Sequence, residues 1–125
     1  MKSTDQREDL QRVWGSDYDA NLDYVTGWHA QSMSLLSQRS GEFAYVTTNS
    51  ITQGQPVPAL FGPLQREGWA IKFAHRTFSW DSEAPGKAAV HCVIVGFSKS
   101  RDFSPRLWDY PRANGEPEAV SYTHL

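Results

Sequence analysis

The chain has a single cysteine, Cys92, among its 125 residues, so it cannot form an internal disulfide bond. Cys92 lies in an apolar run, where we expect a buried, unreactive thiol. A reducing cytoplasm fits this cysteine usage. No apolar run approaches the roughly 20 residues that a membrane helix requires, and the polar N-terminus lacks the apolar core of a signal peptide. These absences favour a cytoplasmic protein without a membrane partner.

The chain also lacks an excess of positive charge, since its formal net charge is −2. A domain that binds DNA unaided is usually basic. The charge therefore argues against autonomous DNA binding and leaves open a local basic patch within a larger enzyme. Hydrophobic residues make up 39% and aromatic residues 13% of the chain. This composition supports one folded domain with a modest core and argues against wholesale disorder.

Apolar spacing predicts an α/β fold with elements in the order helix, strand, helix, strand, strand. The first helix should begin near Leu22, with Asp19 or Asn21 as its cap. The second should begin at Pro56, and Pro63 should bend or shorten it.

The three strands are predicted at residues 43–48, 71–78 and 88–97. The first is short and rich in β-formers, and we expect it to be buried. The third is almost continuously apolar, which is typical of a central strand. The loop of about nine residues between the last two makes them a plausible antiparallel pair. Residues 99–119 are expected to form an irregular extension.

The exit of the strand at 71–78 carries flat rings beside positive charge. Phe78 and Trp80 supply the rings, and Arg76 and Lys87 supply the charge. Such a group suits a nucleobase with its phosphate. The ordinary alternatives are a core position for Phe78, a covered hydrophobic edge for Trp80, and solvated cations.

Polar residues follow the first predicted strand directly. Asn49 and Ser50 lie where ligands of open α/β sheets collect, although a simple turn would use the same residue types. His75 and His91 have no partners at metal-ligand spacing. We therefore expect structural histidines and no metal site.

Three stretches resemble a known protein family: VTTNSITQG at 46–54, FAHRTF through HCVIVGF at 73–97, and LDYVTGWHAQSM at 22–33. They resemble the C-terminal part of the catalytic domain of amino-group DNA methyltransferases, in the branch of MmeI-like restriction-modification enzymes. The resemblance runs from about Lys2 to about Ser98. It implies a bacterial protein with a Rossmann-like sheet, in which the strand at 88–97 is inserted between the other two strands.

The resemblance further implies methyl transfer from S-adenosylmethionine to the N6 amine of an adenine flipped out of double-stranded DNA. Phe78 would stack on that adenine, and Trp28 would lie near the adenine ring of the methyl donor. The alternative for Trp28 is a large side chain on the buried face of its helix.

Two family motifs have no counterpart in this sequence. These are the F-x-G-x-G donor loop and the [D/N]-P-P-[Y/F] tetrapeptide that holds the amine. In the family, both precede the matched segment. The expectation is a partial methyltransferase domain at 1–98, which has no catalytic residues, is inactive alone and depends on the preceding half of the domain.

The sequence ends in VSYTHL at 120–125, which can be written as one reading frame of a transposon mosaic-end adapter. We interpret these residues as an artefact of library preparation, with a natural C-terminus as the alternative. Two other functions stay open. One is a non-enzymatic α/β interaction module whose aromatic loop binds a ligand, and the other is methylation of a free base, RNA or protein.

Overall fold

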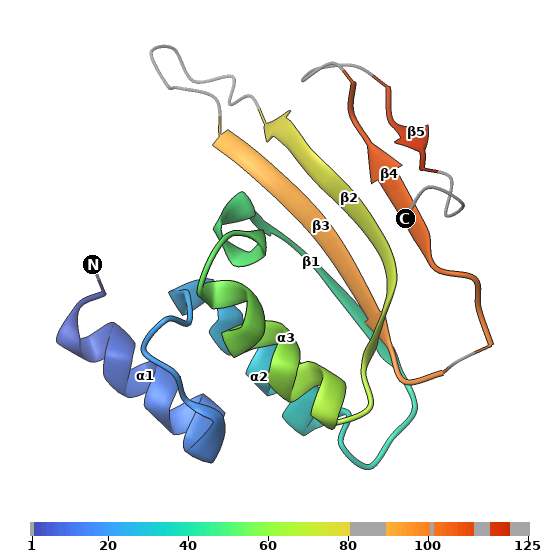
Figure 1. Ribbon diagram of the computed structural model, residues 1–125. Helices are drawn as coiled ribbons and strands as arrows, with labels where there is room; N and C mark the ends of the chain where they lie inside the picture. The colour runs from blue at the N-terminus through green and yellow to red at the C-terminus, as the bar shows by residue number, and fades with distance from the viewer. Residues whose placement is uncertain (1, 81–89, 101, 112–115, 121–125) are drawn as a thin grey trace.

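The computed structural model describes residues 2–80, 90–100, 102–111 and 116–120 as an α/β fold with one mixed five-stranded sheet (Figure 1). The helices are α1 (Thr4–Trp14), α2 (Gly27–Leu35) and α3 (Pro56–Arg66), with 3₁₀ turns η1 (Gly15–Asp17), η2 (Tyr24–Thr26) and η3 (Asn49–Thr52). The strands are β1 (Glu42–Thr48), β2 (Ala70–Trp80), β3 (Val90–Ser98), β4 (Arg106–Asp109) and β5 (Glu118–Ala119).

The sheet order β1-β3-β2-β4-β5 confirms the predicted insertion of the third strand between the first two. β3 pairs antiparallel with β1 on one side and with β2 on the other. β1 and β2 therefore run in the same direction, and α3 lies in the connection between them. The expected first two residues of β3, Ala88 and Ala89, lie outside the described residues.

The three helices gather on one side of the sheet (Figure 1). Phe43 and Tyr45 of β1 and Phe97 of β3 meet the ring of His29 from α2, with ring centroids 5.0–6.1 Å apart. From α3, Leu60 and Leu64 complete this core with almost no exposed surface. β1 thus presents alternate side chains, Phe43 and Tyr45, to α2, as a pleated backbone requires.

The predicted helix boundaries need correction. α2 begins at Gly27, not near Leu22, and its N-cap residue is Thr26 rather than Asp19 or Asn21. The Asp19 carboxylate instead accepts a hydrogen bond from the backbone N–H of Asn21 at 2.8 Å, in a local turn. α3 runs through Pro63 to Arg66, so the expected shortening does not occur.

Two strand predictions also need correction. β1 alternates between exposed and less exposed residues, so it is half-buried rather than buried. The segment 99–119 is not irregular throughout, because it contributes β4, which pairs parallel to β2, and the short β5. Next to β5, the backbone N–H of Val120 donates to the carbonyl of Leu107 at 2.8 Å. Residues 121–125 lie outside the described residues.

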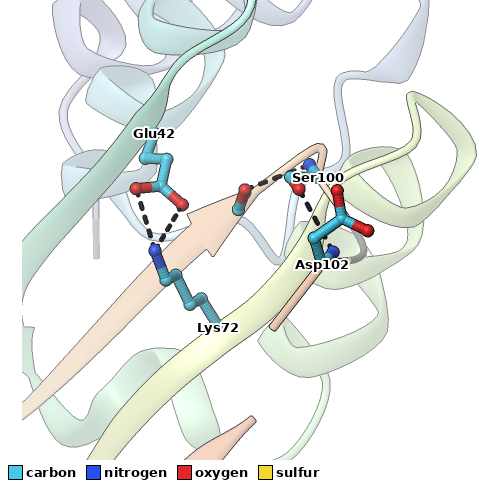
Figure 2. Close-up of polar contacts among 5 residues, drawn as sticks. Glu42, Lys72, Ser100 and Asp102 are labelled. Carbon is cyan, nitrogen blue, oxygen red and sulfur yellow. Dashed lines mark hydrogen bonds and ion pairs between the residues drawn. The ribbon is translucent and has the colours of Figure 1, made fainter. Parts of the chain in front are cut away.

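An ion pair crosses β3 at the end of the sheet where β1 begins (Figure 2). Lys72 Nζ lies 3.0 and 2.8 Å from the two carboxylate oxygens of Glu42. The hydrogen bond from Lys72, followed by one from Ser98, lowers the pKa of Glu42 below its ordinary value. Beyond β3, the backbone N–H groups of Ser100 and Asp102 donate to the hydroxyls of Ser98 and Ser100, respectively. These contacts order the chain as it leaves β3.

Candidate functional site

The end of β1 and the exit of β2 lie in the same row of the sheet. Cys92 of β3 pairs with Thr48 on one side and with Phe78 on the other. Because neighbouring strands lie about 4.8 Å apart, Thr48 and Phe78 are separated by roughly 10 Å. Asn49 and Ser50 follow Thr48 directly in η3. The fold therefore brings together the two segments that the sequence singled out.

A β-bulge sets the direction of Phe78. Residues 75–78 of β2 lie opposite residues 92–94 of β3, so four residues face three. Residues three apart in a regular strand point to opposite faces, and the extra residue returns Phe78 to the face that carries His75. Bulges are frequent beside active sites, where they re-aim side chains.

Phe78 is half-buried, and its ring packs on Tyr110, the residue that follows β4. The two ring centroids lie 5.1 Å apart at an interplanar angle of 36°. The Tyr110 hydroxyl also forms a 2.9 Å hydrogen bond with Nδ1 of His75. Burial lowers the pKa of His75 below its ordinary value. Trp80 is the last residue of β2 rather than a loop residue, and 56% of it is exposed.

Arg76, in the bulge, forms an ion pair with Asp109 of β4 at 3.6 Å. Both side chains are substantially exposed, and pairs of this kind contribute little to stability. Arg76 could therefore exchange Asp109 for a phosphate at small cost. Beside the pair lies a hollow of about 370 Å³, with apolar residues such as Val93 and Leu107 among its lining. Lys87 lies outside the described residues.

Asp23 also belongs to this site, although nothing in the sequence gave it a role there. The Ser50 hydroxyl donates to Asp23 Oδ2 at 2.5 Å and forms a 2.9 Å hydrogen bond with the Thr48 hydroxyl. Asp23 immediately precedes η2, which leads into α2. It therefore ties the turn after β1 to the start of the helix that carries Trp28. In the sequence, Asp23 has only the residue type of a helix cap. Nothing near it in the chain indicates its partner Ser50, which lies 27 residues away.

Trp28 is exposed over 60% of its surface and lines a groove of about 290 Å³ together with residues of α1 and η2. Asp9 and Tyr24 line the same groove. The Tyr24 hydroxyl donates to Asp9 Oδ2 at 2.9 Å, and this hydrogen bond raises the pKa of Tyr24. An exposed indole offers a flat surface on which another aromatic ring can stack, and the neighbouring Asp9 carboxylate can accept hydrogen bonds.

Within the described ranges, no three His, Cys, Asp or Glu side chains are arranged to hold a metal ion. None of the helices described is long and apolar enough to span a bilayer. Cys92 is a buried free thiol, as the sequence predicted.

The chain is similar to DNA-modifying enzymes in three respects. Residues 1–109 match the family model described as "MmeI, DNA-methyltransferase domain". DNA methyltransferase A of Bacillus subtilis (strain 168) is 34% identical over 97 residues, which are 77% of this chain and 11% of that protein. The structure of the Type IIL restriction-modification enzyme MmeI in complex with DNA is 41% identical, with a TM-score of 0.86, over 95% of this chain and 16% of that one. The chain thus spans only a small part of each relative.

Proposed function

Because the chain belongs to the MmeI DNA-methyltransferase domain family, we propose that it forms part of an adenine-N6 DNA methyltransferase within a restriction-modification enzyme. That enzyme would transfer a methyl group from S-adenosylmethionine to an adenine flipped out of double-stranded DNA. The chain would supply the side of a Rossmann-like sheet that receives the base. The observation that carries the proposal is the shared row of Thr48, Cys92 and Phe78.

Phe78 would receive the flipped base. Extrusion of a base costs a few kcal/mol, and stacking on an aromatic ring contributes about 1–3 kcal/mol per base, so one ring can offset much of that cost. Its ring is half-buried against Tyr110 and keeps some accessible surface. Trp80 would contact an adjoining nucleotide, and Arg76 and Lys87 would bind phosphates.

Asn49 and Ser50 would lie on the β1 side of the base. The Ser50 hydroxyl donates to Asp23 and accepts from the Thr48 hydroxyl, and these two hydrogen bonds support this role because they fix the turn in one geometry. A turn that is already ordered before the base enters loses less conformational entropy on binding.

Trp28 and Asp9 would hold the adenosine part of S-adenosylmethionine, which supplies the methyl group as a sulfonium electrophile. The groove they line has a volume of about 290 Å³. The sequence contains no [D/N]-P-P-[Y/F] tetrapeptide. We therefore propose that the groups that hold the amine lie outside these 125 residues and that the chain alone is inactive.

The test is Phe78→Ala in the complete protein that carries this chain. We expect methyl transfer to DNA to fall about 5- to 150-fold, which is the rate equivalent of one stacking contact. Transfer of a labelled methyl group to a DNA duplex measures the rate, and digestion to nucleosides shows whether N6-methyladenine forms.

Phe103→Ala is a matched control, because Phe103 is a half-buried ring near Lys72, away from the candidate site. It should leave the rate close to that of the wild type. Unimpaired methylation by Phe78→Ala would remove the stacking role. Label found in RNA, protein or free base, with none in DNA, would overturn the substrate assignment.

A further inference from the structure

The end of β4 is tied to the exit of β2 at three successive points. The parallel ladder between the two strands runs as far as His75 and Trp108. Beyond it, Arg76 pairs with Asp109 at 3.6 Å, and Tyr110 then contacts both His75 and Phe78. The β-bulge interrupts the ladder between β2 and β3 immediately before Phe78. The end of β4 therefore supports Phe78 in addition to its pairing with Cys92 of β3.

We infer that Tyr110 is a positioning residue that holds the ring of Phe78 in the orientation in which it stacks on a flipped base. This inference rests on the proposed function. Tyr110 lies one residue beyond the part of the chain that matches the family model, which ends at residue 109. The family match therefore assigns no role to this position.

The contacts of Tyr110 explain how it can fix another ring. Its hydroxyl is hydrogen-bonded to His75, and the His75 ring in turn stacks on Trp108 with an interplanar angle of 16°. One end of Tyr110 is thus held by the β2–β4 ladder, and its ring packs against Phe78. The centroid distance of 5.1 Å lies within the range in which aromatic pairs attract beyond simple burial.

A ring fixed before binding makes a better stacking surface than one that must be ordered by the base. Immobilising a free side chain on binding reduces affinity. Phe78 pairs with Cys92 immediately after the bulge, and the ring of Tyr110 adds a side-chain contact that backbone pairing does not supply. Loss of Tyr110 should therefore reduce base capture without changing the DNA-binding surface.

The experiment uses the complete protein and a DNA duplex with 2-aminopurine at the target position, whose fluorescence rises when the base leaves the stack. Tyr110→Leu should lower the flipped fraction and kcat/KM about 2- to 10-fold, the equivalent of one aromatic contact. The DNA dissociation constant should stay unchanged, because phosphate contacts dominate it. Tyr110→Phe keeps the ring and should retain most of the flipped fraction.

Phe103→Leu is the matched control, since Phe103 precedes β4 and its ring lies near Lys72 rather than in the contacts that hold Tyr110. We expect the flipped fraction of this variant to stay near that of the wild type. An equal loss in Phe103→Leu and Tyr110→Leu would show that any change in the segment around β4 has this effect and would overturn the inference.

A double-mutant cycle with Phe78→Ala decides whether Tyr110 acts through Phe78. If it does, Tyr110→Leu should cause no further loss in the Phe78→Ala background, whereas additive losses would overturn the inference. If Tyr110→Leu fails to fold, Tyr110→Met repeats the cycle with a flexible apolar side chain. A Phe78→Ala variant with normal base flipping would contradict the proposed stacking role of Phe78. Impaired flipping in Phe78→Ala together with normal flipping in Tyr110→Leu would contradict only the positioning role of Tyr110.

Discussion

At the scale of single residues, His29 should make folding sensitive to acid. It is 1% exposed among the core rings, and burial lowers its pKa from 6.5 to about 4. Below pH 6.5 the unfolded chain therefore binds a proton that the folded chain excludes. The stabilisation that depends on neutral His29 should be fully present above pH 6.5. The free energy of unfolding should fall by about 3 kcal/mol as the pH drops to about 4. Urea unfolding at several pH values between 4 and 7.5 measures this dependence.

His29→Leu should flatten the dependence, because it removes the titrating ring and keeps an apolar side chain. His75→Gln provides the control. His75 is less buried than His29 and its pKa is also lowered by burial, so this variant should keep most of the wild-type pH dependence. Parallel curves for the wild type and His29→Leu would show that the buried imidazole is not the source.

Residue types identified part of the candidate site from sequence alone. Phe78, Asn49 and Ser50 could be singled out because each follows or ends a strand whose pattern is visible locally. Asp23 and Tyr110 could not, because their partners lie 27 and 32 or more residues away in the chain. Such contacts depend on the strand order and on the bulge, which hydrophobic spacing does not encode.

At the scale of elements, a second bulge fixes how β2 packs on β3. The register shifts between Ile71 and Phe73, and Phe73 consequently lies opposite Gly96. A Cβ at Gly96 would come within 2.3 Å of Phe73 Cε1. Gly96→Ala should therefore destabilise the chain by about 1–3 kcal/mol, because the ring must move away from β3. Urea or thermal unfolding measures the change.

Gly27→Ala is the matched control, since the added methyl group would meet Leu10 and Val13 at an ordinary 3.7 Å. Its stability should stay the same or rise by up to about 1 kcal/mol, because alanine favours the helix. If Gly96→Ala proved as stable as Gly27→Ala, the Phe73 ring would not be confined in the way described here.

Strands were easier to predict than helix starts in this chain. The almost unbroken apolar run of β3 predicts a central strand, and in the structure β3 pairs with β1 along one edge and with β2 along the other. α2 has no side-chain cap at its first turn, so nothing in the sequence marks Gly27 as its beginning. β4 was missed because its residues, RLWD, show no clear alternation. Its pairing with β2 depends on tertiary contact rather than on local pattern.

At the scale of the whole molecule, β1 forms one edge of the sheet. An exposed edge offers backbone groups that can pair with another chain. We expect the isolated chain to self-associate as its concentration rises, and Val46→Lys on β1 to weaken this association. Sedimentation velocity over a concentration series measures it.

Ile71→Lys is the control, because Ile71 is also an exposed apolar residue (42% against 51% for Val46) but lies on an internal strand. It should leave the association nearly unchanged. A wild-type chain that stays monomeric at every concentration would instead favour the non-enzymatic interaction module.

The central location of β3 also has a consequence for synthesis. β3 is the last of the three longest strands to leave the ribosome, yet it occupies the space between the other two. Until residues 90–98 have emerged, β1 and β2 lack the strand that joins them, and non-local pairing of this kind is slow to form. Cys92 of β3 pairs with both Thr48 and Phe78. A nascent chain that ends before β3 would therefore contain β1 and β2 but could not hold Thr48 and Phe78 in one row of the sheet.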